Sequence, residues 1–141
     1  MPFPSTCFNV IVSFETIEHL EYPEVYLEEI CRVLTPRGTL IISTPNREVT
    51  NPGGSLEDRP KNPFHEREFS SVEFKALLEN YFNQIRYYGQ GFCRIGDGTL
   101  ARRLKKLVNL QLSWRVISWP DGAEEQPTYI LAVCRGKKIG F

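Results

Sequence analysis

The chain has 141 residues, of which 41% are hydrophobic and 24% are charged, and these fractions are typical of a globular domain. Its length allows one domain with one modest core and no second domain. Lysine plus arginine number 17, as do aspartate plus glutamate, so no global field would recruit nucleic acid or an anionic membrane. No window reaches the roughly 18 apolar residues of a membrane span, and no secretory leader pattern opens the sequence. We therefore expect a cytoplasmic protein with no membrane or nucleic-acid partner.

The cysteines are scattered without a C-x-x-C pair, and three of the four lie inside apolar runs, where a thiol behaves as a small hydrophobe. They are Cys7, Cys31, Cys93 and Cys134. This usage predicts reduced cysteines in a core, with a disulfide or a zinc site as the alternative.

The first 45 residues have the pattern of a strand, a helix and a second strand. Residues 9–14 (NVIVSF) predict a strand covered on both faces in a parallel sheet. Pro23 suits a first helical position, and apolar side chains then recur at helical spacing, at Leu27, Ile30, Cys31 and Leu34. Residues 35–38 (TPRG) predict a turn that ends this helix, and residues 39–43 (TLIIS) predict a second buried strand. Such a unit places its two strands parallel and adjacent.

The rest of the chain alternates loops with further elements. Residues 44–68 are polar and rich in Pro, Gly and Asn, which predicts a long functional or mobile loop. Ser70 and Glu73 then fit a capping box, flanked by Phe69 and Phe74 as a hydrophobic staple. The helix that begins there has the apolar stripe Phe74, Leu77, Leu78 and Tyr81. We expect a strand at residues 84–88, an amphipathic helix at 99–112, a turn-rich segment at 120–127 and a buried strand at 129–134.

Several residue strings resemble the type-11 group of class I S-adenosylmethionine-dependent methyltransferases. Residues 1–20, with MPFP followed by FNVIVSFETIEHL, are similar to the fourth strand of that group and the turn after it. Residues 32–46 (RVLTPRGTLIISTPN) are similar to its RVLKPGG turn and fifth strand, and residues 62–69 (NPFHEREF) to a common subgroup. Asn9 stands where aspartate is common, and Arg37 where the second glycine of the turn is common. The resemblance covers residues 1–90 and the last strand.

This resemblance implies an α/β fold, namely a partial Rossmann-like methyltransferase sheet with flanking helices. The sheet order of the group is 3-2-1-4-5-7-6, and this chain would supply the strands equivalent to 4, 5, 6 and 7. The glycine-rich turn and the acidic residue that hold the cofactor in this group precede the matched stretch. We therefore expect residues 1–141 to form a single partial domain without the N-terminal cofactor-binding half, with a divergent insertion at residues 91–128. The strand at residues 9–14 would become an edge, open to pairing with a second copy or with the missing half.

The cofactor implied by the resemblance is S-adenosyl-L-methionine. Ligands of doubly wound sheets lie beyond the carboxyl ends of the strands, which places residues 13–16 and 44–46 on the rim of a cleft. By resemblance, the cofactor-binding residues are Ser13, Phe14, Glu15, Thr16 and His19. The alternatives are a core position for Phe14 and turn or helix capping for Glu15 and Thr16.

The candidate catalytic residues are His65 and His19, the only histidines in the chain. Methyl transfer from a sulfonium mainly requires alignment, and a general base is needed only when the acceptor is a hydroxyl or a protonated amine. The alternative for His65 is a hydrogen bond that anchors its loop. We expect no metal. The alternative is a divalent cation, because Glu15, Glu18, His19 and His65 resemble the ligand set of small-RNA 3'-terminal 2'-O-methyltransferases.

Two further motifs are weaker. Four basic residues in the predicted helix at 99–112 could contact phosphate, but their helical spacing is more typical of a solvated face; they are Arg102, Arg103, Lys105 and Lys106. Gly89 and Gly91 imitate a dinucleotide-binding turn, but Arg94 occupies the place of the third glycine, so we reject that interpretation.

The sequence thus predicts an enzyme that transfers a methyl group from S-adenosylmethionine to a small molecule or a glycan-linked acceptor. The alternatives are metal-assisted RNA 2'-O-methylation and a non-catalytic vestigial domain that interacts through its exposed strand edge.

Overall fold

The chain folds around one five-stranded sheet with helices beside it. The computed structural model describes residues 1–94, 116–119 and 125–138. Its elements are β1 (Phe8–Ser13), the short 3₁₀ helix η1 (Ile17–His19), α1 (Pro23–Val33), β2 (Leu34–Pro45), α2 (Arg47–Thr50), α3 (Ser71–Glu79), β3 (Phe82–Arg94), β4 (Ile117–Ser118) and β5 (Glu125–Lys137). The predicted helix at residues 99–112, with its four basic residues, lies outside the described residues.

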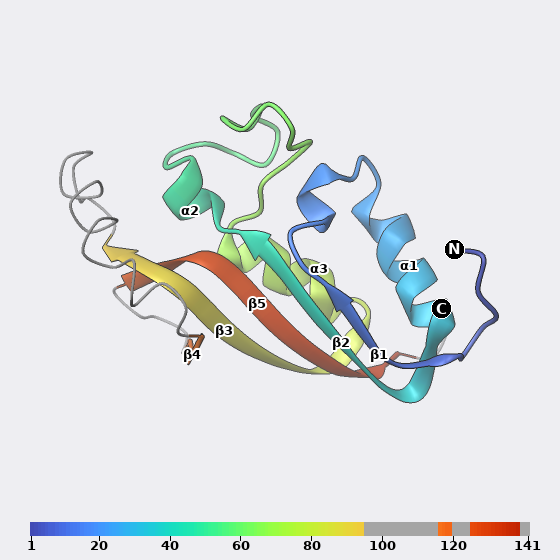
Figure 1. Cartoon of the computed structure of the whole chain (residues 1–141). Coiled ribbons are helices and arrows are strands. Elements are labelled where there is room, and N and C mark those ends of the chain that lie inside the picture. The colour runs from blue at the N-terminus through green and yellow to red at the C-terminus, as the bar shows by residue number, and fades with distance from the viewer. Residues whose placement is uncertain (95–115, 120–124, 139–141) are drawn as a thin grey trace.

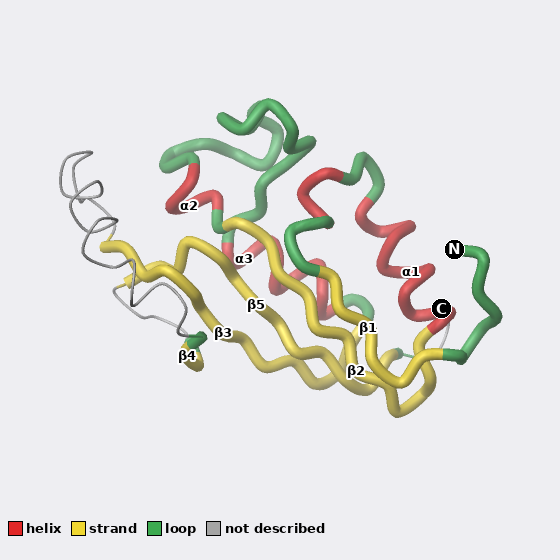
Figure 2. The backbone as a smooth tube through the Cα atoms, viewed as in Figure 1, coloured by secondary structure: helices red, strands yellow, loops and turns green. Residues whose placement is uncertain are grey.

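The strand order of the sheet is β1-β2-β5-β3-β4 (Figure 2). β1 and β2 are parallel, and β5 lies antiparallel between β2 and β3. The four long strands therefore follow the order 4-5-7-6 that the resemblance implied, which confirms the predicted partial α/β sheet. Gly89 and Gly91 lie inside β3, where Gly89 pairs with Ile130 of β5, and do not form a turn after a strand.

The core lies between one face of the sheet and the helices α1 and α3 (Figure 1). In the middle of β2 and β5, alternate residues are fully buried on this face, namely Leu40 and Ile42 of β2 and Ile130 and Ala132 of β5. Leu27 and Ile30 of α1 belong to the same cluster as Phe74 and Leu78 of α3. Apolar residues at helical and strand periods thus meet in one layer. None of the helices that the structure describes is long and apolar enough to cross a membrane.

The predicted start of α3 is confirmed in detail. The Ser70 side chain accepts a hydrogen bond from the backbone N–H of Glu73 at 3.3 Å, and the Glu73 carboxylate accepts one from the backbone N–H of Ser70 at 2.7 Å. The rings of Phe69 and Phe74 are 6.1 Å apart, as a hydrophobic staple requires. This reciprocal cap fixes where the loop at residues 51–69 ends and α3 begins.

The expectation that β1 is covered on both faces is wrong. Val10 and Val12 are 56% and 54% exposed. β1 is the outer strand of the described sheet, and no described helix lies on the face opposite α1 and α3. The exposed apolar pattern therefore marks a face and an edge that have no cover within the described residues.

The turn expected at residues 35–38 lies instead inside β2. Phe8 pairs with Leu34 and Val10 pairs with Thr39, so the register shifts and the intervening residues of β2 bulge. A Cβ atom on Gly38 would lie 2.6 Å from Cγ of Leu34, so a larger residue at this bend would have to displace the Leu34 side chain. α1 and β2 are therefore joined without a separate loop.

The thiols of Cys7, Cys31 and Cys134 are free, and the last two are buried. Burial raises the pKa of Cys31 to about 11 and that of Cys134 to about 12, so both remain protonated at neutral pH. The core interpretation is confirmed for these two, whereas Cys7 is exposed. The side chain of Cys93 lies outside the described residues.

Candidate functional site

A pocket lies where the carboxyl ends of β1 and β2 meet the loop between α2 and α3. Its volume is about 630 Å³. It is lined by Glu15, Glu18, His19, Pro45, Thr50, Lys61, Asn62, Phe64, His65, Glu68 and Tyr129. Four of the residues singled out from the sequence therefore share one cavity: Glu15, Glu18, His19 and His65.

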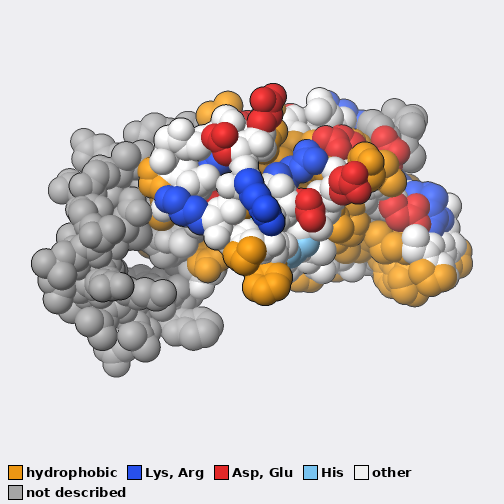
Figure 3. Space-filling view, turned by 90° about the horizontal axis from the view of Figure 1, so that it is seen from above, with side chains coloured by type: hydrophobic (Ala, Val, Ile, Leu, Met, Phe, Trp, Pro, Cys, Tyr) orange, Lys and Arg blue, Asp and Glu red, His pale blue; other side chains and the backbone are white. Residues whose placement is uncertain are grey.

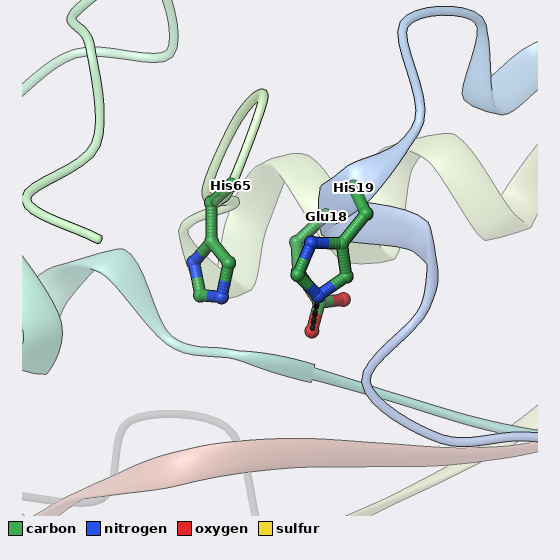
Figure 4. Close-up of side chains that lie close together, drawn as sticks. All are labelled: Glu18, His19 and His65. Carbon is green, nitrogen blue, oxygen red and sulfur yellow. Dashed lines mark ion pairs between the residues drawn. The ribbon is translucent and has the colours of Figure 1, made fainter. Parts of the chain in front are cut away.

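Two separate segments bring the histidines together. Glu18 and His19 belong to η1, and His65 belongs to the loop that precedes α3. The backbone carbonyl of Glu18 accepts hydrogen bonds from the backbone N–H groups of Glu66 and Arg67, at 2.8 and 3.1 Å. The two imidazole rings stand edge to face with their centroids 4.9 Å apart (Figure 4). The backbone thus holds the two segments that carry these rings next to each other.

Each histidine is oriented through its Nδ1 atom. Nδ1 of His19 lies 2.7 Å from the carbonyl oxygen of Phe64, and Nδ1 of His65 lies 2.8 Å from Oε1 of Glu68. Both partners are acceptors, so in each neutral ring the proton sits on Nδ1 and the Nε2 atom carries a lone pair. Nε2 of His65 is 2.8 Å from Nδ2 of Asn62, which donates to it. Oε2 of Glu68 in turn accepts from the Thr50 hydroxyl.

Glu18 is a buried carboxylate beside these rings. Its residue is fully buried, and its Oε1 atom has no hydrogen-bond partner among the described residues. Oε1 lies 3.9 Å from Nε2 of His19, and Oε2 lies 3.5 Å from the Thr44 hydroxyl. Burial raises the pKa of Glu18, with a smaller contribution from the nearby Glu15 carboxylate.

Glu15 lies two residues after the end of β1 and has an unusual backbone conformation. Its φ of +48° is rare for a residue with a side chain, and strain of this kind concentrates at functional sites. The Ser43 hydroxyl donates to Oε1 of Glu15 at 2.6 Å and accepts from its backbone N–H at 3.2 Å. Burial raises the pKa of Glu15, and the Ser43 hydrogen bond opposes this shift. Glu15 is therefore held against β2 at the pocket wall rather than capping a helix.

The other predicted cofactor residues, Ser13, Phe14 and Thr16, are not among the residues that line the pocket. Ser13 is buried and its Oγ accepts from the Tyr26 hydroxyl at 2.8 Å. Phe14 is 53% exposed, so the core alternative for Phe14 is wrong. Thr16 precedes η1 but makes no side-chain cap, and its hydroxyl donates to the carbonyl of Phe14.

Sequence reasoning missed the residues that orient His65. Glu68, Asn62 and Thr50 contact His65 or its partner, and none was singled out from the sequence. The spacing His65-x-x-Glu68 was the available signal. Of the three residues expected on the rim after β2, Pro45 lines the pocket, whereas Asn46 is buried and caps α2.

Comparison with known proteins decides the family. Residues 2–110 match the family model described as a methyltransferase domain, and the sheet order agrees with it. The chain belongs to the class I S-adenosylmethionine-dependent methyltransferases. The match extends into the segment that we expected to diverge, residues 91–128.

Two curated relatives come from mycobacteria. A probable S-adenosylmethionine-dependent methyltransferase of Mycolicibacterium smegmatis is 43% identical over 125 residues, which cover 85% of this chain and 46% of the relative. A probable S-adenosylmethionine-dependent methyltransferase of Mycobacterium tuberculosis is 42% identical over 78 residues, which cover 55% of this chain and 27% of the relative. The chain thus spans less than half of the length of each.

Solved methyltransferase structures share the fold. An S-adenosylmethionine-dependent methyltransferase from Thermotoga maritima, described as a possible histamine N-methyltransferase, superposes with a TM-score of 0.68 at 19% identity, over 97% of this chain and 60% of that one. A methyltransferase from Haloferax volcanii, solved in complex with the activator Trm112, superposes with a TM-score of 0.56 at 14% identity, over 100% of this chain and 59% of that one. These superpositions show that the chain shares the fold of these methyltransferases.

Proposed function

We propose that this protein takes part in methyl transfer from S-adenosylmethionine to a small-molecule or glycan-linked acceptor. The observation that carries the proposal is the shared pocket at the carboxyl ends of β1 and β2, into which Glu15, His19 and His65 open. In sheets of this kind, ligands bind beyond the carboxyl ends of the strands. Family membership then indicates which ligand to expect there.

The chemistry of the pocket suits a cationic cofactor. Three carboxylates line it, from Glu15, Glu18 and Glu68, against the single lysine Lys61. The aromatic side chains of Phe64 and Tyr129 also line it, and aromatic faces attract cations. Bound S-adenosylmethionine would supply a methyl group that its sulfonium already activates. In this proposal Ser13, Phe14, Glu15, Thr16 and His19 hold its methionine part, with Glu15 fixed by Ser43.

The two histidines act on the acceptor. A hydroxyl or a protonated amine must lose a proton before or during methyl transfer. The Nε2 atoms of His19 and His65 are the basic imidazole positions in the pocket, because each Nδ1 faces a hydrogen-bond acceptor, the Phe64 carbonyl or the Glu68 carboxylate. His65 is the better fixed of the two, since its side chain is 10% exposed and that of His19 is 41% exposed.

A small acceptor fits this pocket better than an RNA strand. Its volume of about 630 Å³ falls within the range of small-molecule sites, roughly 300–1,000 Å³. In the view from above, acidic and basic side chains are interspersed (Figure 3). Binding of an RNA backbone instead favours a continuous basic stripe. These features support a small molecule or the end of a glycan as the acceptor.

A partner strand would complete the sheet at β1. β1 is the outer strand of the described sheet, and its Val10 and Val12 side chains are exposed. An apolar outer strand is a template for another strand. The occupant we propose is either a second copy of the chain or the part of a methyltransferase that precedes this stretch in its longer relatives.

Calorimetry with S-adenosylmethionine tests the proposed function. The chain is titrated alone and after mixing with the separately expressed N-terminal part of the M. smegmatis relative. We expect saturable binding in the mixture, weakened by Glu15→Ala and unchanged by Glu28→Ala, a control on the exposed side of α1. Absence of binding in both samples would instead favour a non-catalytic interaction module.

A further inference from the structure

The pocket contains a buried carboxylate oxygen that has no hydrogen-bond donor among the described residues. This atom is Oε1 of Glu18, and the residue is fully buried. Nε2 of His19 lies 3.9 Å from this oxygen, and that atom carries a lone pair when the ring is neutral. A buried carboxylate oxygen without a donor is destabilising. An electron-pair acceptor between these atoms would relieve that cost.

Three lone-pair atoms face one another here. The structure places Oε1 of Glu18 beside the rings of His19 and His65, and Figure 4 shows the three side chains directed toward a common space. The Nδ1 atoms of both rings are already bound to Phe64 and Glu68. We propose that Glu18, His19 and His65 bind a divalent transition-metal ion, through Oε1 of Glu18 and the Nε2 atom of each histidine.

The spacing of these side chains suits such an ion after a small adjustment. One ligand atom from each residue lies within 4.8 Å of the others. Ligands at about 2.1 Å from an ion are at most about 4 Å apart, so the side chains need to close by about 1 Å. The ion would displace the Asn62 amide, which now donates to Nε2 of His65. Three protein ligands leave coordination positions open for water or an acceptor.

The surroundings have the features of a metal site. Histidines that bind metals usually donate their other ring N–H to a carboxylate or a backbone carbonyl, and His65 and His19 do so to Glu68 and Phe64. Two backbone hydrogen bonds to the carbonyl of Glu18 hold the loop against η1. Two nitrogen ligands and one oxygen ligand favour a transition metal over Mg²⁺ or Ca²⁺, which prefer oxygen. Glu15 lies outside this group of three, and the Ser43 hydroxyl donates to Oε1 of its carboxylate.

The ion gives the proposed methyl transfer a different route to acceptor activation, and this part of the inference rests on that proposed function. An ion next to an acceptor hydroxyl lowers the pKa of that hydroxyl, and the proton leaves to solvent. The oxygen then forms the new bond to the methyl carbon while the carbon–sulfur bond of S-adenosylmethionine breaks. His19 and His65 would act as ligands instead of bases.

Titration with Co²⁺ tests the site directly, by calorimetry and by the visible absorption bands of the bound ion. We expect one Co²⁺ per chain with micromolar affinity. Glu18→Gln and His65→Gln should each weaken binding about tenfold or more, a loss typical of disturbed metal sites. Glu66→Gln, which removes an exposed charge from the same loop, should change the affinity by less than about threefold. Circular dichroism of the metal-free variants checks that each one folds.

Several outcomes would overturn the assignment. These are the absence of visible bands at millimolar Co²⁺, or an affinity that Glu18→Gln leaves unchanged. If Glu15→Gln weakened Co²⁺ binding as much as Glu18→Gln does, the ligands would not be the proposed set of Glu18, His19 and His65. Binding of S-adenosylmethionine is measured separately. Cobalt binding without cofactor binding therefore contradicts the proposed function alone, and cofactor binding without cobalt binding contradicts the metal site alone.

Discussion

Glu68 holds the imidazole of His65 in one orientation: its Oε1 atom lies 2.8 Å from Nδ1 of His65. The same carboxylate accepts from the Thr50 hydroxyl through Oε2. Glu68 is 4% exposed, so contacts within the protein, and not solvent, set the position of its carboxylate. It therefore decides which ring nitrogen of His65 opens into the pocket.

Replacement of Glu68 should weaken metal binding without removing a ligand. In Glu68→Leu, Nδ1 of His65 loses its acceptor, and we expect Co²⁺ affinity to fall about 10- to 100-fold. Glu68→Gln keeps an acceptor oxygen and should lose less. Calorimetric titration of both variants measures the difference. Equal affinities in Glu68→Leu and the parent chain would show that Glu68 does not position His65.

The capping box predicts a measurable loss of stability at the start of α3. In Ser70→Ala, the backbone N–H of Glu73 loses its side-chain acceptor, and we expect the free energy of unfolding to fall by about 1 kcal/mol. Urea denaturation followed by circular dichroism measures it. Val72→Ala is the control, because Val72 is 71% exposed on the same helix and alanine favours helix. A similar loss in both variants would contradict the role of the cap.

The exposed strand β1 predicts self-association of the isolated chain. Val12 is 54% exposed on the outer strand of the described sheet, and charged side chains on such strands oppose strand addition. We expect the mass from light scattering to rise with concentration for the parent chain and to stay monomeric for Val12→Lys. Val25→Lys, on the exposed side of α1, should behave as the parent chain does. A parent chain that is monomeric at all concentrations would show that β1 does not pair two copies.

Glu29 predicts a loss of stability at acid pH. Hydrogen bonds from Arg32, and then from the N-terminal ammonium, lower the pKa of Glu29 from 4.5 to about 2. Because the folded pKa lies below the unfolded one, the stabilisation is complete above pH 4.5 and disappears as pH falls toward 2. Glu29→Gln should therefore unfold at lower urea concentration at neutral pH, and the difference from the parent chain should shrink across that range. A difference that does not depend on pH would contradict this pairing.

Local signals in the sequence predicted local structure well. The cap of α3 was predictable because Ser70, Glu73 and their flanking phenylalanines lie within six residues of one another. The parallel pair β1 and β2 followed from two apolar runs separated by a helix pattern. The exposure of Val10 and Val12 did not follow from the apolar run itself, because it depends on which segments lie beside β1; only the family resemblance indicated that this strand would be an edge.

The site was only partly predictable for a similar reason. Both histidines and Glu18 were singled out from the sequence, but their contact depends on backbone hydrogen bonds from Glu66 and Arg67 to the carbonyl of Glu18. These bonds join segments nearly 50 residues apart, and the loop that carries Glu66 and Arg67 shows neither helical nor strand periodicity in its sequence. The division of roles between Glu15 and Glu18 likewise depends on Ser43, which only the fold brings to Glu15.

The location of cofactor binding tests the central claim most directly. Nuclear magnetic resonance of the ¹⁵N-labelled chain, mixed with the unlabelled N-terminal part of the M. smegmatis relative, follows each backbone amide as S-adenosylmethionine is added. We predict that the amides of Phe14, Glu15 and His19 shift most and that those of α3 remain nearly unchanged. Saturating cofactor that leaves these three amides unshifted, or that shifts mainly the uncovered face of the sheet, would contradict the account.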